Sequence, residues 1–391
     1  MTRILSLVLA FILSIQPCLA QSRAAGRQAR YDLRVLRCID QVVADAIREK
    51  QALGAVVVVG TRDHILYRKA FGWRTTGEHQ ELMTLDTIFD MASLTKATAT
   101  ATSVLILAER GELSLNDRVS KYLPEFKGKD KDAVTIRHLL THYSGLRPDV
   151  DVKESWKGYE TGMQLAYQEK LQAEPGTKFI YSDINYFLLS QIVHKVTGQF
   201  IDDFARNNIF KPLHMEDTGF LPPASKRSRI APTEPREGEM IRGEVHDPTS
   251  FRMGGIAGHA GLFSTARDMG IYAQMILGGG VRHGVRILSP YAVLAMTTPQ
   301  NPAGMSDARG YGWDIDTSYS VPRGDFFPRG SFGHTGFTGT SLWMDPYSGS
   351  FVLILSSRLY PEGKGNVSSL RARIASIAAA AVRMDIRGMY K

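Results

Sequence analysis

The chain has 391 residues, of which 43% are hydrophobic and 22% are charged, and its formal net charge is +8. This composition is typical of an ordinary globular protein with a large buried core, and the chain has no internal repeat and no low-complexity tract. Its basic residues are dispersed and no nucleic-acid-binding motif accompanies them, so we expect no nucleic-acid partner. The positive charge is compatible with loose association with an anionic envelope surface, or with a solvated face.

The first residues have the pattern of a secretory signal peptide. Arg3 supplies a basic start, residues 4–15 are apolar, and residues 16–20 end in small side chains. This pattern predicts a signal peptide over residues 1–20, cleaved near Ala20, and therefore export to the periplasm or the extracellular space. The apolar run is short for a bilayer span, but an uncleaved anchor running to Ala20 is the alternative.

Cys38 is the only cysteine left after removal of the signal, so no intrachain disulfide can form. It lies among Leu36, Ile39 and Val42 in a segment of helical pattern. We therefore expect a buried, inert thiol.

The predicted elements favour one catalytic domain over residues 21–391. Residues 33–50 have a helical pattern, residues 55–59 and 65–69 form two strands, residues 86–304 are mainly helix and loop, and a strand-rich return from Tyr311 ends in a helix over 369–384. Because strands occur at both ends of the chain, they must pair into one antiparallel sheet. We predict an α/β (α+β) fold in which N- and C-terminal helices flank this sheet. The sheet lobe covers about 30–85 and 305–391, the helical lobe about 86–304, and the site lies at their junction.

Ser93 and Lys96 form an S-x-x-K tetrad ahead of a long apolar, alanine-rich stretch. Positions i and i+3 share one face of a helix, so Lys96 should lie beside the Ser93 hydroxyl. The tetrad is common by chance, and taken alone it is more typical of a surface helix with Ser93 as its N-cap.

Two later fragments of the sequence favour a catalytic role for the tetrad over a helix N-cap. Tyr181, Ser182 and Asp183 precede an apolar run, so Tyr181 should project from a loop that enters a helix. His334, Thr335 and Gly336 precede two apolar segments, 341–345 and 351–355, which a Pro-Tyr-Ser-Gly turn separates. These segments predict an antiparallel hairpin that begins beside the site.

In this order the fragments resemble the serine β-lactamase and penicillin-binding-protein superfamily, with its S-x-x-K, Y-x-N and K-T-G elements. The similarity is greatest to the class C branch, which includes esterases, D-amino-acid peptidases and muropeptide amidases. Three further segments carry the resemblance: Leu139–Leu146 (L-L-T-H-Y-S-G-L), Glu174–Gly176 (E-P-G) and Gly254–Thr265 (G-G-I-A-G-H-A-G-L-F-S-T).

Asp183 and His334 depart from the family pattern, which has asparagine and lysine at these positions. An ionised aspartate only accepts hydrogen bonds, and beside Lys96 it favours the ammonium, which shifts proton transfer toward Tyr181. A histidine is half-charged near neutrality, so we expect binding of an acidic substrate group to fade as the pH rises.

The resemblance implies acyl transfer through a serine ester, without a cofactor. Ser93 is the expected nucleophile, Lys96 and Tyr181 share the proton transfers, and the backbone N–H groups of Ser93 and Phe337 form the oxyanion hole. For substrate binding we expect Asp183, His334, Thr335 and Gly336.

The sequence assigns a role less specifically to three further histidines. His246 and Asp247 resemble a metal pair, but no third ligand has suitable spacing, so we expect no metal. His142 should pack structurally with a backbone hydrogen bond, and His259 is equally compatible with the pocket wall and with a structural role.

The sequence therefore predicts a secreted serine hydrolase acting on peptidoglycan-derived peptides or amides, as a D-amino-acid carboxypeptidase or muropeptide amidase does, or on small esters. The alternatives are a catalytically idle protein that binds cell-wall fragments and a class C-type β-lactamase.

Overall fold

The structure, a computed structural model, describes residues 31–77 and 79–383. The predicted signal peptide, residues 1–20, lies outside the described residues. Among the residues that are described, no helix is both long enough and apolar enough to cross a membrane.

Within the described residues, eight strands form one antiparallel sheet in the order β11-β12-β13-β14-β15-β1-β2-β3. The strands are β1 (Gly54–Thr61), β2 (Ile65–Thr75), β3 (Glu81–Leu82), β11 (Ala308–Arg309), β12 (Asp314–Asp316), β13 (Phe332–Thr335), β14 (Ser341–Asp345) and β15 (Ser350–Ser356). The predicted hairpin is present as β14 and β15. The N-terminal strand β1 pairs with β15, so the two ends of the chain meet at the centre of the sheet, as predicted.

The central strands β1, β14 and β15 are buried on both faces. Side chains alternate along each strand, and each face is covered by its own core. On β1, Val56 and Val58 pack into a core shared with the middle of the chain, whereas Val57 and Val59 pack into a second core beneath the terminal helices. This explains why β1 reads as a continuous apolar run rather than as an alternating pattern.

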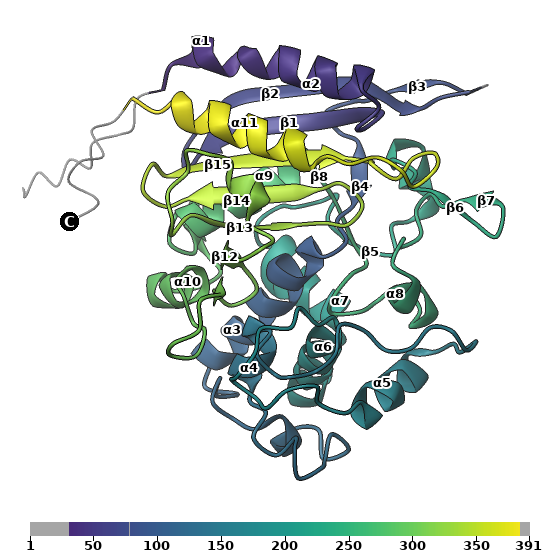
Figure 1. The fold of residues 1–391 in the computed structure, drawn as a ribbon, viewed down its shortest axis with the longest axis vertical. Helices are drawn as coiled ribbons and strands as arrows, with labels where there is room; N and C mark the ends of the chain where they lie inside the picture. The colour runs from purple at the N-terminus through teal and green to yellow at the C-terminus, as the bar shows by residue number, and fades with distance from the viewer. Residues whose placement is uncertain (1–30, 78, 384–391) are drawn as a thin grey trace, which may run out of the picture.

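Terminal helices cover one face of the sheet and α9 (Ala266–Leu277) covers the other, as Figure 1 shows. The terminal helices are α1 (Leu33–Leu36), α2 (Cys38–Arg48) and α11 (Ser368–Ala380). The predicted helix over 33–50 is therefore divided at Arg37. These elements confirm the predicted fold class.

Cys38 is exposed, which contradicts the prediction of a buried thiol. The buried stripe of α2 consists of Ile39, Val42, Val43 and Ala46. Because Cys38 lies one residue, or about 100° of helix rotation, away from Ile39, its side chain is turned off that stripe.

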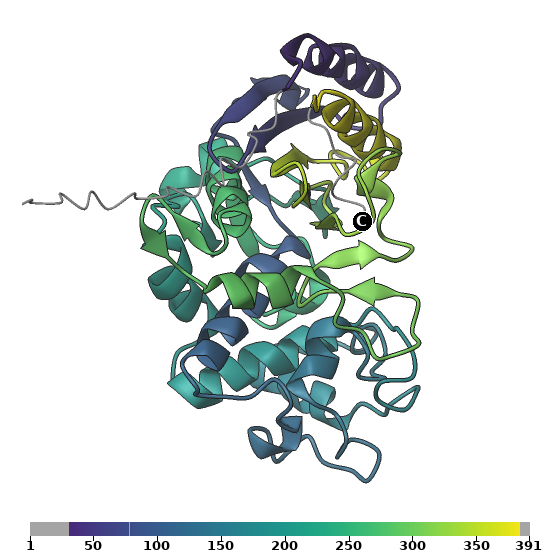
Figure 2. The ribbon, with the colours of Figure 1, turned by 90° about the vertical axis from the view of Figure 1, so that its left-hand side faces the viewer.

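The remaining helices lie mainly in the lower half of the molecule, below the sheet, and Figure 2 shows the two parts from the side. They are α3 (Thr102–Glu109), α4 (Ile136–Thr141), α5 (Tyr159–Gln168), α6 (Ile184–Thr197), α7 (Ile201–Ala205), α8 (Pro248–Arg252) and α10 (Pro290–Thr297). Two π-helical segments, Lys96–Ala101 and Arg206–Phe210, precede α3 and follow α7. Short 3-10 helices span Val119–Lys121, Ala224–Arg229 and Val321–Arg323.

Short strands also occur in the segment between the two parts of the large sheet. The strands β4 (Ile88–Asp90), β5 (Gly219–Phe220) and β8 (Leu262–Thr265) form a three-stranded sheet. Two small hairpins pair β6 (Pro235–Arg236) with β7 (Glu239–Met240) and β9 (Val281–Arg282) with β10 (Val285–Arg286). The pairing of β4 with β8 brings the chain just before Ser93 against the glycine-rich segment 254–265.

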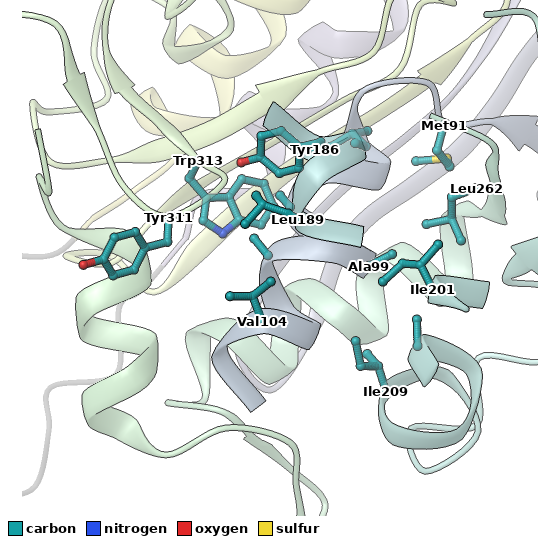
Figure 3. Packing of buried hydrophobic residues seen from close by; sticks show 14 of the residues in the cluster. Met91, Ala99, Val104, Tyr186, Leu189, Ile201, Ile209, Leu262, Tyr311 and Trp313 are labelled. Atoms are coloured by element: carbon teal, nitrogen blue, oxygen red, sulfur yellow. The ribbon is translucent and has the colours of Figure 1, made fainter. Parts of the chain in front are cut away.

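Helices from distant parts of the chain bury the segment that follows Ser93. Figure 3 shows Ala99, Val104, Leu189 and Ile201 in one cluster of buried side chains, together with Trp313, the residue directly before β12. All five are fully buried or nearly so. This packing fixes the Ser93 helix relative to α6 and to the edge of the large sheet, where the site is formed.

Candidate active site

Ser93 lies at a tight turn between β4 and the helical segment that carries Lys96. The residue before it, Ala92, has φ +45°, a left-handed conformation that is uncommon outside glycine. The Asp90 side chain holds this turn by accepting a hydrogen bond from the Ala92 N–H at 2.8 Å. As the i,i+3 spacing predicted, the Lys96 amine faces the hydroxyl, with Lys96 Nζ 2.9 Å from Ser93 Oγ.

Lys96 is completely buried among polar groups. Besides Ser93, its Nζ contacts the His259 carbonyl oxygen at 3.2 Å and Asp183 Oδ1 at 2.6 Å. Burial by itself lowers the pKa of Lys96, but the negative charge of Asp183 and the neighbouring Tyr181 outweigh it, and the net shift of this pKa is upward. The side chain is therefore an ammonium that donates to Ser93, as the sequence departure at Asp183 predicted.

Tyr181 lies in the loop before α6, and its ring is fixed by aromatic neighbours. It stacks on His142 with ring centroids 4.5 Å apart and packs against Tyr319 at 5.2 Å. Lys96 Nζ lies 5.0 Å from the Tyr181 ring centroid. His142 is buried and accepts a hydrogen bond from the Ser182 N–H at 3.0 Å, so it has the structural role that was predicted for it.

The strand β13 and the turn after it approach the Ser93 turn closely. The Thr338 hydroxyl donates to the Asp90 carbonyl at 2.7 Å, and the Thr340 hydroxyl donates to the Met91 carbonyl at 3.2 Å. A Cβ atom at Gly336 would lie 2.6 Å from the Met91 oxygen and 2.1 Å from Thr340 Oγ1. Position 336 therefore requires glycine because two backbones meet there.

The backbone N–H groups of Ser93 and Phe337 are free to act as donors. Neither has an acceptor within residues 31–77 and 79–383. Both residues line a pocket of about 140 Å³, together with Tyr181, Arg309, Asp314, Tyr319, His334 and Thr335. The pocket thus holds the predicted nucleophile beside two unused donors, which is the arrangement that an oxyanion hole requires.

His334 differs from the expectation of a half-charged group. It is 4% exposed, and burial together with the positive charges of Arg309 and Lys96 lowers its pKa well below the usual value for histidine. Its Nδ1 lies 2.8 Å from the Thr335 carbonyl oxygen, which can only accept, so the proton is on Nδ1. His334 is therefore neutral at physiological pH, and its Nε2 has no partner in the described structure.

Arg309 and Asp314 also line the pocket, although no sequence motif marks them. Arg309 is fully buried, and its Nη1 lies 3.3 Å from Asp314 Oδ1. Asp314 in turn accepts hydrogen bonds from the Thr317 and Ser320 hydroxyls at 2.7 and 2.6 Å. One indication of them is present in the sequence: two oppositely charged residues, Arg309 and Asp314, occur close together in the segment 308–316, where the C-terminal strands begin.

Asp183, Asp247 and His259 present ligand atoms within 4.8 Å of one another, a geometry that could hold a metal ion. The local spacing around Asp247 does not indicate a complete set of ligands, because Asp183 is distant in the chain. His259 Nε2 is already 2.8 Å from Asp247 Oδ1, and the Lys96 ammonium is paired with Asp183. Since a cation there would face the ammonium, the geometry does not favour a metal.

Comparison with known proteins shows the family. The family profile described as Beta-lactamase matches residues 39–376. A protein of Salmonella agona, provisionally named a D-alanyl-D-alanine carboxypeptidase, is 32% identical over 339 residues, which cover 76% of each chain.

Two solved structures share the fold. The hydrolase EstCE1, described as having promiscuous acyltransferase activity, superposes with a TM-score of 0.73 at 22% identity, over 89% of this chain and 99% of its own. A class C β-lactamase from Rhodobacter sphaeroides gives a TM-score of 0.68 at 23% identity, over 88% of this chain and 99% of its own.

The chain belongs to the β-lactamase family and is a serine hydrolase of the β-lactamase fold. This confirms the resemblance that the S-x-x-K, Y-S-D and H-T-G fragments indicated.

Proposed function

We propose that the protein is an exported serine hydrolase that cleaves peptidoglycan-derived peptides in the manner of a D-amino-acid carboxypeptidase, through an acyl ester on Ser93. The observation that carries this proposal is the cluster in which Lys96 Nζ lies 2.9 Å from Ser93 Oγ, inside a pocket that also holds Tyr181. The name of the 32% identical relative supports the substrate class.

In the proposed acylation, Ser93 Oγ attacks the scissile carbonyl, and the oxygen of Tyr181 is the base that takes its proton. Lys96 does not act as the base because it is held as an ammonium by Asp183. Its charge instead stabilises the anionic oxygens that form beside it. The carbonyl oxygen becomes an oxyanion between the N–H groups of Ser93 and Phe337, the leaving amine takes the proton from Tyr181, and water later hydrolyses the ester.

Intact-protein mass spectrometry tests this proposal. The protein is incubated in parallel with an N-acylated D-alanyl-D-alanine peptide, penicillin and an activated nitrophenyl ester. We expect an adduct on Ser93 that forms and decays with the peptide, and no adduct in Ser93→Ala. Adducts that persist in Ser93→Ala would contradict the nucleophile assignment. Rapid turnover of penicillin alone would favour the class C-type β-lactamase.

The same incubations distinguish the proposed function from two alternatives, a catalytically idle wall-binding protein and a small-ester hydrolase. Turnover of the nitrophenyl ester that is abolished in Lys96→Ala eliminates an idle protein. Turnover of esters without any peptide cleavage would favour the esterase function.

Export and loose association with an anionic envelope surface are part of the proposal. A hollow of about 520 Å³ that includes none of the predicted site residues is lined by Arg68, Arg267 and Arg282, among others. Together with the net charge of +8, these arginines support attraction to anionic polymers or lipids. Cosedimentation with anionic vesicles that is lost at high salt would support the association, and binding that is insensitive to salt would contradict it.

A further inference from the structure

Three arginines from three elements line one hollow of about 520 Å³, hereafter the arginine hollow: Arg68 from β2, Arg267 from α9 and Arg282 from β9. Glu216 is the one acid among its described lining residues, so three positive charges and one negative charge give a formal net charge of +2, with His214 neutral. Positive charges that converge on one hollow repel one another unless an anion lies between them. The lining is therefore suited to an anionic ligand.

The arginine hollow shares no lining residue with the Ser93 pocket, and its volume lies within the range of roughly 300–1,000 Å³ that is usual for small-molecule sites. Along α9 the lining residues Ala266, Gly270 and Gln274 follow i,i+4 spacing, so they share one side of the helix. Because Ala266 and Gly270 are small, space remains beside them. The nearest atom outside the helix to a Cβ added at Gly270 is Phe351 Cζ, at 3.8 Å.

Two of the three guanidinium groups have no carboxylate partner within residues 31–77 and 79–383. Arg68 makes no ion pair there, and Arg282 donates only to a neutral group, from Nε to Gln274 Oε1 at 3.0 Å. Burial and the positive charge of Arg267 lower the pKa of Arg282. Arg267 is the exception, because its Nη1 lies 3.0 Å from Oδ1 of the buried Asp268. An anion in the hollow would therefore gain two unpaired arginines and one that is already held in place.

The deeper part of the lining is apolar. Val58 from β1, Leu213 from the turn 213–216 and Ile271 from α9 are buried, whereas Arg68 and Arg267 are exposed. An apolar interior with a few convergent polar groups is the usual form of a site for a small organic molecule. A ligand that matches both parts has an anionic group and an apolar group.

We infer that the arginine hollow binds an organic phosphate monoester: the three guanidinium groups bind the phosphate oxygens, and the apolar lining contacts the organic group. A phosphate monoester offers three acceptor oxygens and a charge of about −2 at neutral pH, which suits several guanidinium groups at once. A carboxylate, in contrast, is satisfied by the fork of a single arginine. The inference goes beyond hydrolysis at Ser93, and it rests on the proposed function only for the association with an anionic surface, which it makes specific.

Isothermal titration calorimetry tests the inference with three phosphates and one control ligand. The phosphates are inorganic phosphate, glycerol 3-phosphate and dihexanoyl phosphatidic acid below its micelle concentration, and the control is dihexanoyl phosphatidylcholine, which has the same chains but no net charge. We expect glycerol 3-phosphate and phosphatidic acid to bind and phosphatidylcholine not to bind. Phosphatidic acid should bind at least about tenfold more tightly than glycerol 3-phosphate, because its chains contact the apolar lining.

The variants change the hollow without touching the catalytic residues. In Arg68→Gln/Arg282→Gln, Kd for phosphatidic acid should rise about tenfold to hundredfold, and Gly270→Leu, which fills the space beside α9, should weaken binding similarly. The matched control is Arg37→Gln, because Arg37 is an exposed arginine on the other face of the sheet that makes no ion pair within the described residues. Hydrolysis of a nitrophenyl ester at Ser93 and the melting temperature should stay unchanged in the arginine variants. If Gly270→Leu does not fold, the arginine variants still decide the question.

Each result has a definite meaning. Equal binding of phosphatidic acid in Arg68→Gln/Arg282→Gln and in Arg37→Gln would overturn the inference. Equal affinity for glycerol 3-phosphate, or for inorganic phosphate, and phosphatidic acid would overturn the role of the apolar lining and identify a soluble phosphate as the ligand. Salt-sensitive vesicle binding that is the same in all variants would leave the proposed association intact and overturn the hollow as its site. Phosphate binding without any acylation of Ser93 would contradict the proposed hydrolase and support the inference.

Discussion

Lys96 and Asp183 form an ion pair in which the fully buried Lys96 Nζ lies 2.6 Å from Asp183 Oδ1 and 2.9 Å from Ser93 Oγ. The pair decides the protonation state of the site, because an isolated lysine at this depth would lose its proton more readily. A lysine that is held as an ammonium donates a hydrogen bond to Ser93 and leaves the role of base to Tyr181.

Asp183→Asn should change the pH dependence of acylation. Asp183 raises the pKa of Lys96 against the effect of burial, so its removal lets burial lower that pKa. We expect the pH profile of kcat/KM for a nitrophenyl ester to move to lower pH, with about a tenfold or greater loss of rate at neutral pH. Asp203→Asn, which removes an exposed partner of Arg206, is the control. An identical profile in Asp183→Asn and wild type would contradict this account of Lys96.

Titration of His334 should not affect peptide hydrolysis between about pH 6 and 8. Its pKa is well below the usual value of about 6.5, so the ring stays neutral throughout this window. We expect the ratio of kcat/KM for an N-acylated D-alanyl-D-alanine peptide to that for its C-terminal amide to be constant with pH. A ratio that decreases with rising pH around 6.5 would show that His334 is charged in the pocket.

Arg371→Met should impair catalysis although Arg371 does not line the Ser93 pocket. Its Nη2 donates to the Gly336 carbonyl at 3.0 Å and to the Thr340 carbonyl at 2.8 Å, so it holds the turn that carries the Phe337 N–H. We expect kcat to fall about tenfold while KM changes little. The turn positions the Phe337 N–H, which binds the oxyanion formed during the reaction rather than the bound substrate. Arg371→Lys should restore part of kcat. Arg373→Met, on the exposed side of the same helix, is the control, and equal activity of the two methionine variants would disprove a positioning role.

Cys38 should react quickly with a maleimide in the native protein. The thiol is exposed on α2, away from the pocket, so labelling should neither require unfolding nor reduce activity. The rate of mass increase in native buffer and in denaturant measures this, with Cys38→Ser as the unlabelled control. A native rate several orders of magnitude below the denatured rate would indicate a buried thiol.

Leu189→Ala should destabilise the packing that positions the Ser93 helix. Leu189 is fully buried in the cluster of Figure 3, and its truncation leaves a cavity that costs about 2–5 kcal/mol in the free energy of unfolding. Leu294→Ala, at a position that is 56% exposed on α10, should cost less than about 0.5 kcal/mol. Urea unfolding measures both values, and similar costs for the two variants would contradict the packing argument.

Much of the fold follows from local patterns. The long apolar run of β1 and the hairpin of β14 and β15 were predicted because strand patterning and turn residues are properties of short segments. The division of the first helix at Arg37 and the exposure of Cys38 were missed, because a helix face is fixed by its packing partner and a shift of one residue turns a side chain away from the core.

The sequence by itself determined the family, the fold class and the closeness of Ser93 to Lys96, since motif order is linear information and an i,i+3 spacing fixes a shared helix face. Only the tertiary structure decided the neutral state of His334 and the presence of Arg309 in the pocket. Charge state and hydrogen-bond satisfaction depend on burial and on neighbours contributed by distant segments, and neither is encoded in the spacing of one motif.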